Sequence, residues 1–441
     1  MDQIMLYRLL RAFFLLACRI YFRKIQVHGP ALPEGRPFLL VANHPSALLD
    51  AIVLAVISNR PLYFLARGES FDKGWKRFLW RCLHMIPIYR KAHTPELTRR
   101  NPGIFRYCHH LFDSGEGILI FPEGISKTEP RLRPIKTGAA QIALGYESVN
   151  GVDLALIPVG LNYSKPSQFR SELCINMGAE IPLAEDRALA VENPRKAVQQ
   201  LSHRIQLALR QLTVVIDDPS DEALVEHLEL HYKEELLRKA PILRRPGLRS
   251  FLLTKDIVRA VDHFQAEAKP AAKDLSTRIA NYSLRLEAFG LRRFRWPVPS
   301  AHQSTWCRRC HQLLFLLGQL CFFPVRFLSR HTVAVTCQRE DFRASLQLLM
   351  GSLWAVLYGL VGFSLLCWLG QHWWLGLIWL LGMSLLLHHH LSHWDWMEQE
   401  REQKILEQLQ SQQPNALQRL IGERNSLLRD LHHMRDLFLQ D

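Results

Sequence analysis

Residues 38–50 read Phe-Leu-Leu-Val-Ala-Asn-His-Pro-Ser-Ala-Leu-Leu-Asp. The apolar run 38–42 has the length of a buried strand, and two chemically active side chains, His44 and Asp50, follow its end. A histidine can accept a proton near neutral pH, and a carboxylate can orient the ring and stabilise its charged form. Ser46 lacks the sharp Gly-x-Ser-x-Gly turn of a hydrolase, so we expect direct attack by a bound hydroxyl rather than a covalent enzyme intermediate.

A second polar block also follows a strand-like run. Residues 117–120 read Gly-Ile-Leu-Ile, and residues 121–124 read Phe-Pro-Glu-Gly. Basic side chains then follow at Lys127, Arg131, Arg133 and Lys136, and another pair lies at Arg90 and Lys91. Cations placed around backbone amides can bind a phosphate. A lone histidine and carboxylate more often make a structural contact, but two such blocks together favour a site for a phosphorylated substrate.

The composition narrows the class of partner. The chain has 441 residues, a formal net charge of +14 and a pI near 9.5, so it is long enough for one α/β domain and about as much again. The positive charge suits nucleic acid, an acidic bilayer surface or phosphorylated small molecules. The sequence has no zinc-finger, helix-turn-helix or RNP-like pattern, and the long apolar runs of its C-terminal third favour a membrane.

The apolar patterning predicts an α/β domain behind a short leading helix. Residues 1–25 predict an amphipathic helix in the membrane interface, because their uninterrupted apolar run is only 12–18. A signal peptide is less favoured because no small-residue cleavage site follows. Residues 26–215 alternate between strand-like and helix-like runs, which indicates an α/β domain with a largely buried sheet. We expect strands at 37–42, 62–66, 117–121, 154–160 and 172–177, and helices at 47–57 and 135–147.

The remaining segments are predicted to be helical. Residues 216–305 form a charged helical extension, and residues 306–392 form a membrane region. In that region 344–369 and 371–387 carry no charged residue, which predicts a hairpin of two transmembrane helices. The four arginines that precede the hairpin, and their absence from its turn, predict that both ends face the cytoplasm.

Two further patterns leave alternatives open. Residues 313–328 are apolar but interrupted by Pro324 and Arg326, so they could enter the bilayer or lie in its interface. Residues 393–441 predict amphipathic helices broken near Pro414, which could pack on a partner or on this chain.

Two clusters could suggest a metal, and we expect none at either. Residues 307–311 read Cys-Arg-Arg-Cys-His, which matches the short haem-attachment pattern and could also be half of a zinc site. No second cysteine pair at zinc spacing and no export signal accompany them. Residues 388–390 with His393 and Asp395 also gather, but the adjacent histidines and Asp395 match no recognised ligand spacing. The nine cysteines show no small-domain spacing, which indicates reduced thiols in a cytosol-facing protein.

The chain resembles the PlsC-like glycerolipid acyltransferase family in four blocks that occur in the same order. The blocks are Asn43-His44 with Asp50, Pro87-Ile88-Tyr89-Arg90, Phe121-Pro122-Glu123-Gly124 and Ile157-Pro158-Val159-Gly160. The resemblance implies that His44 is the general base toward the acceptor hydroxyl and that Asp50 is its partner. It also implies a site for the glycerophosphate group. The expected substrate-binding residues are Asn43, Arg90, Glu123, Gly124, Lys127, Arg133 and Lys136.

Two departures from the family pattern resemble one branch, the glycerol-3-phosphate/dihydroxyacetone-phosphate acyltransferases of fungi and their bacterial relatives. Five residues separate His44 from Asp50, where most members have four. Ser126 stands where lysophosphatidate acyltransferases commonly have a phosphate-binding arginine. The resemblance therefore implies acylation of the sn-1 hydroxyl of glycerol 3-phosphate, or of dihydroxyacetone phosphate, in phospholipid biosynthesis. Lysophosphatidate or another lysophospholipid is the alternative acceptor.

The same resemblance sets the expected partners. The donor would be an acyl thioester of coenzyme A or of acyl carrier protein, and no cofactor is implied. With the predicted hairpin, it implies an integral membrane enzyme whose catalytic domain faces the cytoplasm, in a bacterial inner membrane or the endoplasmic reticulum. A membrane-anchored scaffold without activity is the competing class, and the presence of both His44 and Asp50 argues against it.

Overall fold

The computed structural model describes most of the chain. It covers residues 3–68, 83–89, 95–147, 152–239, 246–292, 294 and 305–438. Contacts divide the chain into two compact units, which we call the sheet unit (Met1–Val215 with Thr332–Ser352) and the helical unit (Ile216–His331 with Leu353–Asp441). This division groups residues 332–352, which the sequence assigned to the membrane region, with the sheet.

Seven strands in the described residues form one mixed sheet, in the order β1-β7-β6-β2-β5-β3-β4. Neighbouring strands are parallel except for β6 and β7. The strands are β1 (Lys24–His28), β2 (Phe38–Ala42), β3 (Leu62–Arg67), β4 (Met85–Ile88), β5 (Gly117–Ile120), β6 (Ala155–Tyr163) and β7 (Glu172–Met177). The five predicted strands and the predicted α/β fold with a largely buried sheet are confirmed.

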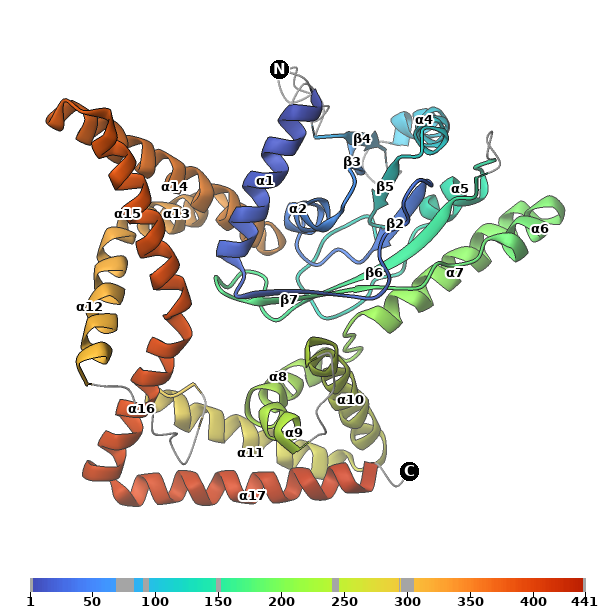
Figure 1. Cartoon of the computed structure of the whole chain (residues 1–441). Helices are drawn as coiled ribbons and strands as arrows, with labels where there is room; N and C mark the ends of the chain where they lie inside the picture. The colour runs from blue at the N-terminus through green and yellow to red at the C-terminus, as the bar shows by residue number, and fades with distance from the viewer. Residues whose placement is uncertain are drawn as a thin grey trace. The chain divides into compact units, whose positions relative to one another are not determined.

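Strand β2 shows why the sheet is covered on both faces. Its five residues are all buried, and successive side chains point to opposite faces. Phe38 and Leu40 pack with α1 and α2, whereas Leu39 and Val41 pack with α4, α5 and α7 on the other face (Figure 1). An uninterrupted apolar run is what a strand between two helical layers requires. The helices of this unit are α1 (Gln3–Tyr21), α2 (Leu48–Ile57), α4 (Asn101–Asp113), α5 (Gly138–Leu144), α6 (Ala184–Glu192) and α7 (Pro194–Leu212).

Helix α1 is amphipathic, as predicted. Its buried face carries Tyr7, Ala17, Cys18 and Tyr21, and the last three belong to the core cluster formed with the sheet and α2. Its other face carries exposed apolar side chains at helical spacing, namely Met5, Leu9, Phe13 and Leu16. Such a stripe is what a helix lying in a membrane interface needs, and its position at a bilayer stays a prediction.

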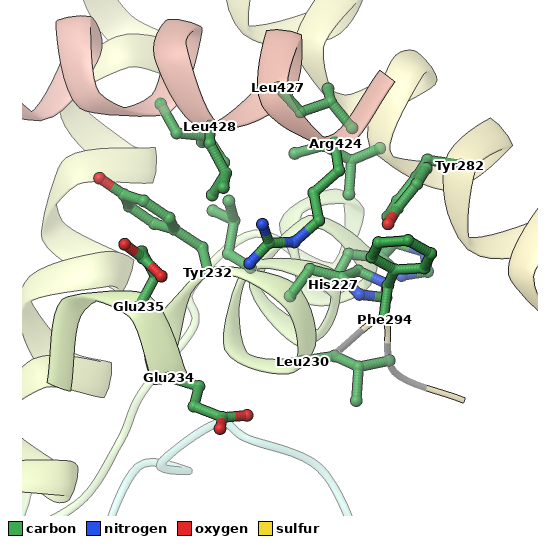
Figure 2. Close-up of a pocket in the computed structure, with 14 residues that line it drawn as sticks. His227, Leu230, Tyr232, Glu234, Glu235, Tyr282, Phe294, Arg424, Leu427 and Leu428 are labelled. Carbon is green, nitrogen blue, oxygen red and sulfur yellow. The ribbon is translucent and has the colours of Figure 1, made fainter. Parts of the chain in front are cut away.

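The helical unit contains the predicted extension and tail. Besides the two long apolar helices described below, its helices are α8 (Glu222–His231), α9 (Lys233–Lys239), α10 (Pro246–Glu267), α11 (Lys269–Ala288), α12 (Thr305–Cys321), α16 (Trp394–Gln412) and α17 (Pro414–Phe438), with α13 (Phe323–Thr336) extending past its border. The tail breaks at Pro414, as predicted, and α17 packs on α11 of the same chain, with an Arg278–Asp430 ion pair of 2.6 Å. Arg424 reaches from α17 into a cavity of about 40 Å³ beside Tyr232 and Tyr282 (Figure 2), which has room for water but not for a lipid.

Two helices are long and apolar enough to cross a membrane, by length and composition: α14 (Glu340–Gly370) and α15 (Trp373–Ser392). They contain the two uncharged runs that predicted a hairpin. A third span results if the bent pair Arg308–Cys321 and Phe323–Thr336 is counted as one, with a bend of 46° at the break. The first turns of α14 belong to the sheet unit, where Ala344 and Leu348 are buried in the core around α2.

Candidate active site

His44 and Asp50 meet at the carboxyl end of β2. The neighbouring strands β5 and β6 run parallel to β2, so the segments that follow all three strands gather at one edge of the sheet. Nδ1 of His44 lies 2.9 Å from Oδ2 of Asp50, and the ring stacks on Phe121 with 3.9 Å between centroids. The His44 side chain is 18% exposed and that of Asp50 is fully buried. The pair predicted from the sequence is therefore in contact.

Asp50 is held by three donors. Besides the His44 ring, its Oδ2 accepts a 2.7 Å hydrogen bond from the Ser46 backbone N–H, and its Oδ1 accepts one of 2.8 Å from the Tyr163 hydroxyl. Desolvation by the core raises the pKa of the Tyr163 phenol, and the Asp50 charge raises it further, so Tyr163 remains a donor. Because a carboxylate can only accept, Nδ1 of His44 carries the proton and Nε2 is left to act as a base.

The loop between His44 and Asp50 contains a strained turn. The buried residue Ala47 has φ 46°, a region that residues other than glycine rarely adopt. Helix α2 begins directly after it, and the backbone N–H of Asp50 bonds the Ala47 carbonyl at 3.3 Å. This turn folds back the five residues between His44 and Asp50, so that the Asp50 carboxylate reaches the His44 ring. Strain of this kind persists where the surrounding packing fixes it.

Glu123 ties the two sequence blocks together. One carboxylate oxygen accepts from the His44 backbone N–H at 2.9 Å, and the other accepts from the Arg133 backbone N–H at 3.3 Å. Burial raises the pKa of Glu123, and these two hydrogen bonds act against that shift. The backbone N–H of Lys127 also bonds the His44 carbonyl at 3.2 Å. Glu123 therefore positions the base and the cationic segment beside each other.

Gly124 and Asn43 also have backbone roles. Gly124 has φ 71°, and a Cβ there would lie 3.0 Å from Nζ of Lys136, so the turn needs a glycine and Lys136 covers it. The Asn43 side-chain amide donates a 3.0 Å hydrogen bond to the Leu161 carbonyl in β6 and accepts one of 2.7 Å from the Leu161 backbone N–H. Its amide thus joins the end of β2 to β6 and fixes the position of the backbone that leads into His44.

Three of the predicted cations share one carboxylate, Glu129, which no sequence pattern indicated. Glu129 pairs with Lys127 at 2.9 Å, with Arg131 at 3.1 Å and with Arg133 at 2.7 Å. Burial acts to raise the pKa of Glu129, but hydrogen bonds from the three cations outweigh it and lower the pKa to about 2. The cluster keeps an excess of positive charge beside His44. Arg90 lies outside the described residues.

Helix α14 supplies two contacts that the sequence did not indicate. The buried Ser345 hydroxyl accepts a 2.9 Å hydrogen bond from the Leu49 N–H and donates one of 3.1 Å to the Ser46 carbonyl. The hydroxyl of Ser126 donates to the carboxylate of Asp341, which also pairs with Arg339 at 2.7 Å. The first turns of a candidate membrane helix therefore hold the loops that carry His44 and Glu123.

The arrangement can move one proton and attract an anion. His44 has a free Nε2, an oriented ring and partial exposure, which a general base needs. The cations at Lys127, Arg131 and Arg133 are tied to the same backbone segment and suit a phosphate. The two functions occur at one edge of the sheet, on the segments after β2 and β5.

Comparison with known proteins gives matches to acyltransferases over part of the chain. Residues 24–162 match the Acyltransferase family model. The glycerol-3-phosphate O-acyltransferase 1 of Saccharomyces cerevisiae is 29% identical over 178 residues, which are 40% of this chain and 22% of that protein. A 1-acyl-sn-glycerol-3-phosphate acyltransferase of Chlamydomonas reinhardtii is 28% identical over 143 residues, 31% of this chain and 40% of that protein. The chain thus spans less than half the length of both curated relatives.

One solved structure is also similar. The PlsC 1-acyl-sn-glycerophosphate acyltransferase of Thermotoga maritima aligns with 46% of this chain and 80% of its own, at a TM-score of 0.33 and 18% sequence identity.

Proposed function

Residues 24–162 match the Acyltransferase family model, and from this match we propose which reaction the chain catalyses. It transfers a fatty acyl chain from a thioester to the sn-1 hydroxyl of glycerol 3-phosphate, or to the hydroxyl of dihydroxyacetone phosphate. The products feed phosphatidic acid and phospholipid synthesis. The observation that carries the proposal is the His44–Asp50 contact of 2.9 Å beside the cations around Glu129.

The proposed reaction uses His44 twice. Its Nε2 takes the proton of the acceptor hydroxyl while the oxygen attacks the thioester carbonyl carbon. The tetrahedral intermediate then breaks its carbon–sulfur bond, and the leaving thiolate takes the proton back from the imidazolium. Asp50 stabilises the imidazolium in between, because its Oδ2 faces the Nδ1 proton. The products are the ester and a free thiol, of coenzyme A or of acyl carrier protein.

The cationic segment favours a phosphorylated acceptor. Lys127, Arg131 and Arg133 are oriented by Glu129, and their excess positive charge suits a phosphate better than a neutral alcohol. The Saccharomyces relative is named glycerol-3-phosphate O-acyltransferase, and its similarity over 40% of this chain and 22% of that protein supports this acceptor. The five-residue spacing and Ser126, which resemble the same branch, support it independently.

The runner-up acceptor is a lysophospholipid such as lysophosphatidate, which also carries a phosphate. The name of the Chlamydomonas relative favours it. The cations do not distinguish the two, because both acceptors present the same anionic group. The five-residue spacing between His44 and Asp50, together with Ser126, is the reason that we favour glycerol 3-phosphate or dihydroxyacetone phosphate.

An acceptor assay separates these possibilities. Purified full-length protein in lipid nanodiscs is incubated with a labelled acyl thioester of coenzyme A or of carrier protein and with each acceptor in turn. We expect labelled product from glycerol 3-phosphate or dihydroxyacetone phosphate, and a loss of about 10²–10⁴-fold in His44→Ala. Acylation of lysophosphatidate alone would replace the acceptor, and activity that His44→Ala leaves unchanged would overturn the proposed role of the base.

The enzyme is proposed to work at a membrane with both ends of its hairpin in the cytoplasm. Helices α14 and α15 could span a bilayer, and their joining residues carry no lysine or arginine. Arg339 and Arg343, at the other end of α14, suit the cytoplasmic side. The orientation is tested with a cysteine introduced at His372 or at Asn415 and an impermeant reagent added to sealed vesicles of known sidedness. We expect the two positions to react from opposite sides of the membrane, with Asn415 on the cytoplasmic side.

A further inference from the structure

Three histidines of the helical unit converge at one point. His311 lies on α12, His389 lies in the last turn of α15, and His393 lies at the junction of α15 and α16. One ring nitrogen from each can be chosen so that all three lie within 4.8 Å of one another. All three side chains are partly buried. The convergence needs an explanation, because neighbouring imidazoles that share no ligand or proton gain little from such an approach.

The local sequence explains how the rings come together. His389 and His393 are four residues apart, so they project from the same face at the end of α15. Helix α12 packs on α15, and Gly318 lies directly against His390, where a Cβ would be 2.9 Å from Nδ1. The absence of a side chain at Gly318 permits this close approach. His311, two turns earlier on α12, then faces His389.

One nitrogen–nitrogen distance matches the geometry of a metal site. Nδ1 of His311 lies 3.1 Å from Nε2 of His389. A tetrahedral zinc site with Zn–N bonds of about 2.0–2.1 Å has about 3.3 Å between neighbouring ligand nitrogens. A hydrogen bond between these two rings would account for that pair alone. It leaves out His393, whose ring stacks on that of His389 at 18° with 4.0 Å between centroids, so binding of one ion by both requires one of these rings to turn.

His393 is also oriented by a second contact. Its Nδ1 lies 3.0 Å from the His389 carbonyl oxygen, so Nδ1 carries the proton and donates it. Its Nε2 is then unprotonated and can bind a cation. A metal-binding histidine commonly donates its other ring N–H to a backbone carbonyl in this way.

We propose that His311, His389 and His393 form a binding site for a divalent transition-metal ion, with zinc as the best match. Imidazole nitrogens suit zinc, and three protein ligands leave the fourth tetrahedral position to water. A bound ion joins α12 to the end of α15 and the start of α16. The site is independent of the proposed acyl transfer, because none of its residues takes part in that chemistry.

The three-histidine site differs from the two clusters that are visible in the sequence, at 307–311 and at 388–395. The expectation of no metal treated the cluster of residues 388–390 with His393 and Asp395 separately from the cysteines beside His311. The structure brings His311 of the first cluster together with His389 and His393 of the second. That pair has a four-residue helical spacing, which is known from zinc-binding helices.

Direct metal binding tests the proposal. The full chain, purified in detergent without added histidines and stripped with a chelator, is titrated with Co²⁺, followed by visible absorption, and with Zn²⁺ against a chromophoric chelator. We expect one ion per chain and the intense bands of tetrahedral Co²⁺. His311→Gln and His393→Gln should each weaken binding by at least about 10-fold. His388→Ala is the matched control, because His388 is exposed on the same helix and outside the cluster.

A second measurement needs no variant. Diethyl pyrocarbonate modifies unliganded histidines, and mass spectrometry gives the rate at each position. We expect saturating Zn²⁺ to slow modification of His311, His389 and His393 by about 10-fold or more, while His388 reacts at an unchanged rate. Absence of stoichiometric Co²⁺ or Zn²⁺ binding by the wild-type chain, equal affinity in wild type and His311→Gln, or unprotected cluster histidines would each overturn the proposal.

Discussion

The Tyr163 hydroxyl donates a 2.8 Å hydrogen bond to Oδ1 of Asp50, the carboxylate oxygen opposite the one that faces His44. Tyr163 ends β6 and His44 follows β2, so two neighbouring strands fix the plane of one carboxylate. The orientation of the His44 ring therefore depends on a residue that does not touch it. Tyr163 is a positioning residue in the proposed reaction.

We expect Tyr163→Phe to lower kcat by about tenfold and to change KM for the acceptor little. The reason is that Asp50 loses one of its three donors, and a hydrogen bond to a charged group contributes about 1.5–3 kcal/mol. The measurement is steady-state acyl transfer together with its pH profile. A purely structural role would lower the amount of folded enzyme but leave the pH profile of the remaining activity unchanged.

Ser345→Ala should lower both activity and thermal stability. The buried hydroxyl bonds the Leu49 N–H and the Ser46 carbonyl, and the loss leaves both without that partner. We expect a cost of about 1–3 kcal/mol in stability and a reduced kcat. Ser364→Ala is the control, because Ser364 is an exposed serine on the same helix. Equal melting temperatures and equal kcat in the two variants would contradict the coupling of α14 to the catalytic loop.

Arg133→Gln should raise KM for a phosphorylated acceptor by about tenfold or more, with a smaller effect on kcat. A charge-assisted hydrogen bond to phosphate is lost, whereas the Arg133 backbone N–H still bonds Glu123. Arg36→Gln is the matched control. Arg36 precedes β2, at the opposite end from His44, and pairs with Glu180 on the surface. The idea fails if the two substitutions raise KM equally.

Glu123 gives a pH dependence whose sign can be worked out. Burial raises its folded pKa above the ordinary value of 4.5, so the folded state holds this proton more tightly than the unfolded state. The resulting stabilisation is complete below pH 4.5 and is lost as pH rises through the folded pKa. Comparing melting temperatures of wild type and Glu123→Gln from pH 4 upward, we expect the wild-type advantage to shrink with rising pH. A constant or growing advantage would contradict the raised pKa.

Much of the fold followed from local patterns. The run at 38–42 predicted a buried strand, because a strand with no polar residue needs cover on both of its faces. The uncharged runs at 344–369 and 371–387 predicted two helices long enough for a membrane, because length and polarity are read directly from the sequence.

The sequence by itself determined the chemistry of the proposed site: a histidine and an aspartate after one strand, and a glutamate with basic residues after another. Only the tertiary structure decided which residues hold them. Ser345 and Leu49 are 296 positions apart, and their contact depends on how α14 packs on α2. His311 meets His389 for the same reason, because α12 packs on α15. Periodicity reports the face that a residue occupies, whereas partners at long range are set by packing.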